Sequence, residues 1–180
     1  HTRCLSDWSS DVCSSDLFVE CNSEDVIRLR GAEIVPCPIC GGRLKVHGSC
    51  RRKLQITSRD TVIYHLRVMK CCECGKTHRE LPDGVIPYKR MSADHFTQVA
   101  RVPAESALTG RELENVEPNT WRRTAAWMRW FLQYVRPVLA VVGLTPLPAA
   151  FCVGDMTARQ TEHFVRLVVN SGFWLQHRSV

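Results

Sequence analysis

Two cysteine pairs of matching form constrain this chain more than any other feature. The first occupies Cys37–Gly41 (Cys-Pro-Ile-Cys-Gly) and the second Cys71–Gly75 (Cys-Cys-Glu-Cys-Gly). A Cys-x-x-Cys step lets two sulfurs from one tight turn reach the same ion, and tetrahedral zinc takes four such ligands at roughly 2.3 Å. The glycine after each pair can adopt a positive φ and turn backbone N–H groups towards the sulfurs. The spacing therefore predicts one structural zinc ion, with these ligands: Cys37, Cys40, Cys71 and Cys74.

Cys71 is predicted as a ligand in preference to its neighbour Cys72, because only Cys71 reproduces the spacing of the first pair. Three other interpretations remain: a redox dithiol, two unrelated cysteine pairs, and disulfides in a secreted chain. A redox Cys-x-x-Cys usually opens a helix after a strand, whereas Pro38 and the glycines at 41 and 42 make the first pair a turn. Because protein fills all four positions, the predicted zinc offers no open position to a substrate.

The basic residues are concentrated in the segment that carries the cysteines. Residues 37–90 contain twelve Lys or Arg against four Asp or Glu, in a chain of 180 residues with a formal net charge of +6. A dense basic segment attracts polyanions. No stretch near the start resembles a signal peptide, so a cytoplasmic location is expected. The most apolar run, 135–153, is interrupted by arginine, glycine and prolines, so no membrane span is expected.

Three regions are predicted along the chain. Residues 1–17 are polar, follow neither hydrophobic period and repeat Ser-Ser-Asp, and they look like the translation of a sequencing adapter fused to the reading frame. We expect them to be a non-native tail that contributes nothing to folding; an ordinary disordered tail is the alternative. Residues 18–90 are predicted to form a zinc-ribbon domain and residues 91–180 a helical domain that resembles a helix-turn-helix.

The predicted fold class is α+β, a small antiparallel zinc ribbon followed by a helical region. Within the ribbon we expect strands over 44–47 and 53–57 with a turn at 48–51, a second turn at 58–60, and a strand over 61–70 that alternates apolar and polar residues. In this arrangement the basic run Arg51–Lys53 stands at a hairpin tip. A sheet of this size cannot bury enough apolar area alone, so the metal is expected to supply much of its folding energy.

Three helix starts can be predicted from capping residues. Ser92 caps a helix that ends near Pro103, a short helix is expected within 104–118, and Asn119 or Thr120 caps the longest helical pattern, which Pro137 limits or kinks. Thr157 opens the last helix with a capping box. The arginines at 122, 129 and 136 share a face, which is either simply solvated or the exposed face of a helix-turn-helix recognition helix.

Several groups of residues resemble a known family. They are the Cys-Pro-Ile-Cys-Gly-Gly knuckle, the turn at 47–53, the segment 71–82 with its Cys-x-x-Cys-Gly-Lys-x-His-Arg-Glu-Leu-Pro pattern, and Pro-Tyr-Lys-Arg at 87–90. Over residues 34–131 the chain resembles an uncharacterised bacterial family whose members are similar to the zinc-ribbon and helix-turn-helix front ends of transposases. The resemblance implies nucleic-acid binding and an association with mobile elements. Cys50 departs from the family, which has arginine there.

The basic turn, the second knuckle and the helical face together give the candidate contacts to nucleic acid. His78 is interpreted either as a phosphate contact or as a donor to a metal ligand. The full set is Arg51, Arg52, Lys53, Lys76, His78, Arg79, Lys89, Arg90, Arg122, Arg123 and Arg129.

Two functions from different classes fit these features. The first is a zinc-dependent DNA-binding protein associated with a transposon or other mobile element. The alternative is a protein-interaction adaptor whose ribbon docks on a polymerase or transposase assembly. The sequence has no nucleophile with an adjacent base, no phosphate-binding loop and no nucleotide fingerprint, so no enzymatic activity is predicted.

Overall fold

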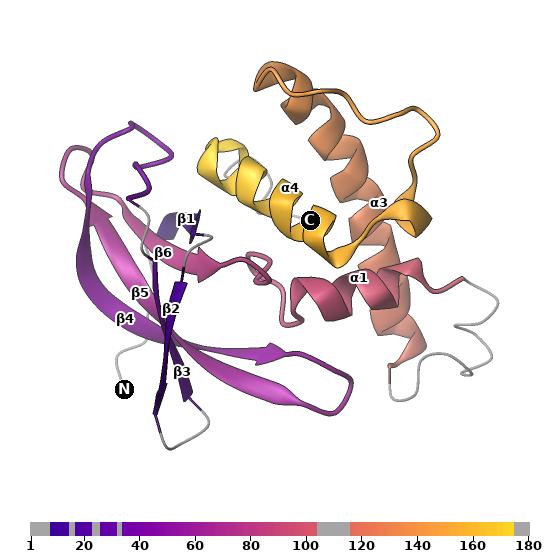
Figure 1. The fold of residues 1–180 in the computed structure, drawn as a ribbon, viewed down its shortest axis with the longest axis horizontal. Helices are drawn as coiled ribbons and strands as arrows, with labels where there is room; N and C mark the ends of the chain where they lie inside the picture. The colour runs from indigo at the N-terminus through magenta and orange to yellow at the C-terminus, as the bar shows by residue number, and fades with distance from the viewer. Residues whose placement is uncertain (1–7, 15–16, 23–25, 32–33, 104–115, 175–180) are drawn as a thin grey trace.

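The computed structural model describes residues 8–14, 17–22, 26–31, 34–103 and 116–174. The first part of the chain forms a sheet and the second part a group of helices that packs beside it (Figure 1). The predicted α+β class is therefore confirmed. None of the described helices combines the length and apolar character needed to cross a membrane.

The sheet has six strands in the order β1-β6-β5-β3-β2, and β4 pairs with the other edge of β5. Pairing is antiparallel between β4 and β5, β5 and β6, and β2 and β3, as in the predicted ribbon, but parallel between β1 and β6 and between β3 and β5. The strands are β1 (Trp8–Ser14), β2 (Leu17–Asn22), β3 (Val26–Gly31), β4 (Leu44–Gln55), β5 (Thr61–Cys71) and β6 (Thr77–Pro82).

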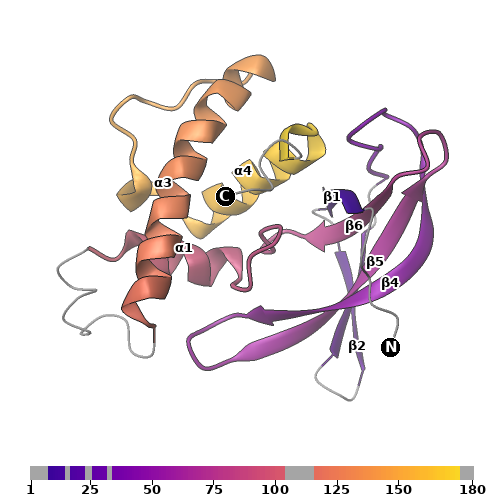
Figure 2. The same ribbon diagram turned by 180° about the vertical axis from the view of Figure 1, so that it is seen from behind.

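The turn predicted at 48–51 is wrong. β4 runs unbroken from Leu44 to Gln55, and an irregularity between Val46 and Gly48 leaves His47 as an extra residue without reversing the chain. Consequently Arg51 and Lys53 lie along the middle of a strand and point to one face, while Arg52 between them points to the other. The hairpin tip lies instead at residues 56–60, which extend beneath α1 (Ala93–Arg101) in both views (Figures 1 and 2).

Two further helices complete the described part: α3 (Pro118–Val141) and α4 (Ala158–Asn170), preceded by the short 3-10 helix η1 (Val153–Asp155). In Figures 1 and 2 α4 lies between the sheet and α3. The expected short helix within 104–118 falls largely on residues 104–115, outside the described part. Pro137 lies inside α3, which continues for four more residues.

One hydrophobic core joins the sheet to the helices. The alternation predicted for residues 61–70 is confirmed, since β5 turns Leu66 inward, 1% exposed, and Val68 beside it on the same face. This core crosses the predicted domain boundary at residue 90, and whether the two parts fold separately stays a prediction. Its most deeply buried large side chains are Leu54, Leu66, Leu81, Ile86, Met128, Phe131, Met156, Val135 and Val168.

Two of the predicted caps are confirmed. The Ser92 hydroxyl accepts a hydrogen bond from the His95 N–H at 3.1 Å, and Thr157 forms a capping box with Gln160. The start of α3 was predicted too late, because the cap residue is Glu117, which makes no side-chain cap bond and is followed by proline at the first helical position.

Arg136 has a structural role that its spacing from Arg122 and Arg129 does not indicate. Its guanidinium donates hydrogen bonds to the carbonyls of Leu147 at 3.3 Å and Phe151 at 2.7 Å, and to the intervening backbone. The other two arginines are exposed. Arg136 therefore anchors the loop after α3 to the helix.

Replacing Arg136 with methionine should lower the free energy of unfolding by about 1–3 kcal/mol, because several hydrogen bonds from a charged donor to backbone carbonyls are lost. A fall in melting temperature of a few degrees is expected by calorimetry. Arg129→Met is the matched control on the same helix and should leave the melting temperature within a degree. Equal melting temperatures for the two variants would contradict the anchoring role.

Residues 8–14, within the predicted tail, form strand β1 and pair in parallel with β6 from Thr77 to Pro82. The absence of a hydrophobic period gave no indication of this strand. The structure thus brings the segment to a sheet edge, while its contribution to stability stays a prediction.

Deleting residues 1–17 should leave the melting temperature unchanged within error, because this polar segment carries few apolar side chains whose burial would be lost. Thermal unfolding of the truncated and full-length chains, followed by circular dichroism, tests the expectation. A drop of several degrees would show that the pairing of β1 with β6 stabilises the fold.

Candidate metal centre

The structure brings the two cysteine pairs to one point. Knuckle 1 (Cys37–Gly42) precedes β4, and knuckle 2 (Cys71–Lys76) connects β5 to β6. In each knuckle the N–H of the first cysteine donates to the carbonyl five residues later at 2.9 Å, and the glycine N–H donates back to that cysteine's carbonyl, at 2.8 and 3.2 Å. The two glycines have φ of 72° and 71°, as their predicted role requires.

The four predicted ligand atoms all lie within 4.8 Å of one another. The Sγ atoms of Cys37 and Cys74 are 3.7 Å apart, and those of Cys40 and Cys71 are 3.5 Å apart. Four sulfurs at 2.3 Å from a tetrahedral ion would stand about 3.8 Å from each other. The distances are too long for disulfides. The cluster therefore suits a single tetrahedral metal ion.

Cys72 does not belong to this cluster. Its side chain is exposed, and its N–H donates to the carbonyl of Arg43 at 2.9 Å, a bond that ties knuckle 2 to the residue after knuckle 1. Gly42 lies close to the same junction, where a Cβ would come within 3.0 Å of the Cys71 sulfur. The two knuckles thus contact each other through backbone as well as through sulfur.

The environment of the sulfurs is unequal. Burial raises the pKa of the Cys37 thiol to about 12, whereas the backbone N–H groups of Cys74 and Glu73 lower the pKa of the Cys71 thiol to about 7. The Glu73 N–H lies 3.4 Å from the Cys71 sulfur. Cys71 therefore ionises more easily than Cys37. Metal binding must displace a proton from the Cys37 thiol, so metal affinity falls as pH falls.

His78 belongs to the metal centre and not to the surface. Its side chain is 0% exposed, and its Nε2 lies 3.4 Å from the Cys37 sulfur. With its proton on Nε2 the ring donates to that sulfur, the arrangement of an outer partner that orients a ligand. A side chain without exposed surface cannot contact a phosphate, so the assignment of His78 to the nucleic-acid contacts is corrected.

Arg52 is also bound within the fold and is removed from the predicted surface contacts to nucleic acid. One nitrogen of its guanidinium donates to the carbonyls of Ile86 at 2.6 Å and Lys89 at 2.8 Å, so it holds the loop after β6 against β4. Arg79 lies over the ring of Tyr88, 5.5 Å from its centroid.

The other basic residues predicted to contact nucleic acid lie in separate parts of the fold. Arg51 and Lys53 are exposed on the outer face of β4, and Lys76 is exposed on knuckle 2. Arg122 and Arg129 are exposed on α3, while a cavity between the sheet and the helices is lined by Lys89, Arg90 and Arg123.

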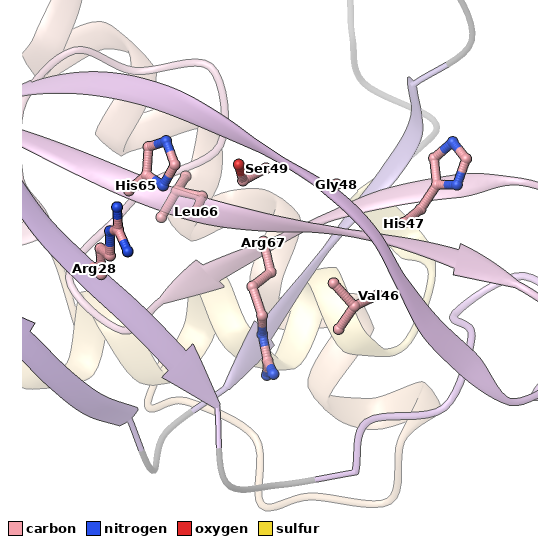
Figure 3. A pocket seen from close by; sticks show the side chains of 8 residues that line it. All are labelled: Arg28, Val46, His47, Gly48, Ser49, His65, Leu66 and Arg67. Carbon is pink, nitrogen blue, oxygen red and sulfur yellow. The ribbon is translucent and has the colours of Figure 1, made fainter.

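An open groove of about 560 Å³ lies on the outer face of the sheet (Figure 3). Arg28 and His65 line it side by side on β3 and β5, and His47 lines its far end on β4. Arg67 in the groove is already paired, with Nε 2.6 Å and Nη2 2.7 Å from the carboxylate of Glu80. Sequence reasoning missed Arg28 and both histidines, although the apolar and basic alternation of 26–30 was a weak strand signal.

These features define an α+β chain with a four-cysteine cluster suited to one metal ion. Residues 37–123, which hold both knuckles and the start of α3, match a family described as a domain of unknown function (DUF6431). The match lies within the segment whose residues resemble an uncharacterised family, and it carries no link to transposases. No curated protein and no solved structure matches the chain.

Replacing Cys71 with serine should abolish stoichiometric metal binding, because only three sulfurs then remain in the cluster. Native mass spectrometry with elemental analysis on the purified chain measures the stoichiometry. Cys72→Ser, one residue away and outside the cluster, should retain one metal ion per chain. Metal retained by Cys71→Ser and lost by Cys72→Ser would reverse the assignment.

Proposed function

We propose that this chain is a zinc-dependent DNA-binding protein, in which one structural zinc ion holds the two knuckles and the outer face of the sheet contacts the phosphate backbone. Four thiols are the ligand set that structural zinc prefers, and four protein ligands leave no open position for catalysis. We therefore propose that the metal holds the sheet in place and that the sheet binds DNA.

The observation that supports DNA binding is a cross-strand row of basic side chains. Arg28, His65 and Arg51 are direct partners across β3, β5 and β4, so all three share the outer face of the sheet. Lys53 lies two positions further along β4 on the same face. Arg28, Arg51 and Lys53 are exposed, and side chains of one charge sign on one face attract a polyanion.

One carboxylate beside this row is already neutralised. Glu80 is 5% exposed and bound in a bidentate pair by Arg67, whose Nη2 also donates to the Gly31 carbonyl at 3.0 Å. Arg67 neutralises Glu80, so this carboxylate does not oppose Arg51 and Lys53, whereas the register of the sheet sets Glu20 of β2 opposite Arg28. This charge distribution favours contact with phosphate. Phosphate contacts position a protein on DNA without specifying sequence.

An adaptor role is the second candidate. It is supported by exposed apolar side chains around knuckle 1, where Ile34 is 93% and Ile39 is 42% exposed. The resemblance to the front ends of transposases supports a place in a mobile element under either function, and a docking partner would then be another subunit of that assembly.

Neutralising Arg51 and Lys53 together, as Arg51→Gln/Lys53→Gln, should weaken binding to a blunt duplex and flatten the slope of log affinity against log salt. The loss of two phosphate contacts predicts a change in slope of about 1.8. Fluorescence anisotropy over a salt series measures the slope. Any sequence preference should survive.

The control is Arg101→Gln/Arg159→Gln, which removes the same charge from exposed positions on α1 and α4. This pair should leave the salt slope as in the wild type. If the β4 variant keeps the wild-type affinity and slope, the outer face is not the contact surface. The adaptor role would then be favoured if the chain binds a protein partner, if this binding is insensitive to salt, and if it depends on Ile39.

A further inference from the structure

A second cavity lies where the end of β4, the loop from β6 to α1 and the start of α3 meet. Its volume is about 610 Å³, within the range of cavities that hold a small ligand. The described residues that line it include three cations and no carboxylate. The cations come from two separate segments of the chain: Lys89 and Arg90 from the loop, and Arg123 from α3.

These cations are held close together by the fold. Lys89 is half-buried, and its Nζ lies 4.7 Å from the ring centroid of Trp127. Burial lowers the pKa of Lys89, and the charge of Arg123 lowers it further. Two like charges near each other in a partly buried site destabilise the empty cavity, and an anion bound between them removes that repulsion.

Tyr88 adds an aromatic ring to the cavity wall. Its side chain is 49% exposed, and its φ of 61° is the only positive value at a non-glycine residue in the described part of the chain. A residue of this type rarely adopts such a conformation, and outliers of this kind cluster at ligand sites. An exposed ring beside cations is the arrangement on which unpaired bases stack.

The end of β4 links the outer face of the sheet to the cavity. Lys53 and Gln55 lie two positions apart on the same face of β4, and Gln55 lines the cavity. At about 3.3 Å per residue, the distance along the strand from Lys53 to the cavity is about 7 Å. A nucleic-acid strand that leaves the outer face therefore reaches the cavity within a short step.

We propose that this cavity binds one unpaired nucleotide at the end of the DNA held by the outer face, with the base on the face of the Tyr88 ring opposite Arg79 and the phosphate among the three cations. The inference rests on the proposed function, because the nucleotide belongs to the same DNA. The preferred ligand is therefore a DNA duplex with a single-stranded end.

The test compares three probes by fluorescence anisotropy with the full-length, metal-loaded chain. They are a blunt 20-bp duplex, the same duplex with a three-thymidine overhang, and free hexathymidylate. The wild type should bind the overhang duplex at least about fivefold more tightly than the blunt duplex, the lower end of what stacking of one base provides.

Two pairs of variants isolate the cavity. Tyr88→Leu should abolish the overhang preference and leave blunt-duplex affinity unchanged, whereas Tyr88→Phe keeps the ring and should keep the preference. Arg123→Gln should reduce the preference, while Arg159→Gln, an exposed arginine on α4 away from the cavity, should not. Equal melting temperatures and metal content establish that each variant is folded.

The outcomes separate the two proposals. Blunt-duplex binding without any Tyr88-dependent gain from the overhang overturns the cavity and leaves the outer face standing. Tyr88-dependent binding of hexathymidylate without blunt-duplex binding supports the cavity and overturns the outer face as a duplex surface. If none of the three probes binds, both proposals are overturned.

Discussion

The convergence of four thiols within 4.8 Å is the constraint on which the rest of this structure depends. Knuckle 1 leads into β4 and knuckle 2 joins β5 to β6, so an ion at this point fixes the ends of three strands at once. The same point reaches the helices. A Cβ on Gly172, just after α4, would collide with the carbonyl of Pro38 in knuckle 1, so the backbones meet there and only glycine fits. Metal, sheet and helix α4 are therefore coupled through one small region.

That coupling explains why a ribbon of this size can carry exposed charge on one face. The inner face of β4 and β5 shares a core with α1, α3 and α4, so apolar burial holds the sheet from one side and the sulfur cluster holds its ends. The outer face has no packing role along Arg51 and Lys53, and the residues there are free to be cationic. Arg67 and Glu80 show the alternative, in which a basic side chain on the same face is committed to a nearly buried carboxylate.

The sequence predicts the features whose physical cause is local. Cysteine spacing with a following glycine encodes a knuckle, a hydroxyl before a helix encodes a cap, and alternation encodes the buried face of β5. The features it does not predict depend on partners distant in the chain. Gly48 indicates a turn by composition, yet pairing with β5 makes this place a bulge at His47. The sequence leaves His78 either as a phosphate contact or as a donor to a metal ligand, and only the position of Cys37, 41 residues away, decides for the donor. The predicted nucleic-acid contacts are the hardest to derive from the sequence, because a count of basic residues does not reveal which of them are buried or already bound within the fold.

The division of the basic residues is itself informative about recognition. Arg52 binds carbonyls of the loop that carries Lys89, and that loop forms the wall of the cavity, so an arginine of the ribbon positions the cations beside the helices. Alternate residues of β4 thus serve both surfaces: Arg51 and Lys53 face outward, and Arg52 between them supports the loop that lines the cavity. Under the proposed function, contacts made by the row would bring the DNA close, and the cavity would then act at a high effective concentration. A modest contact at each surface would then be enough for selective binding of a duplex end, since the second contact does not repeat the entropy loss of the first.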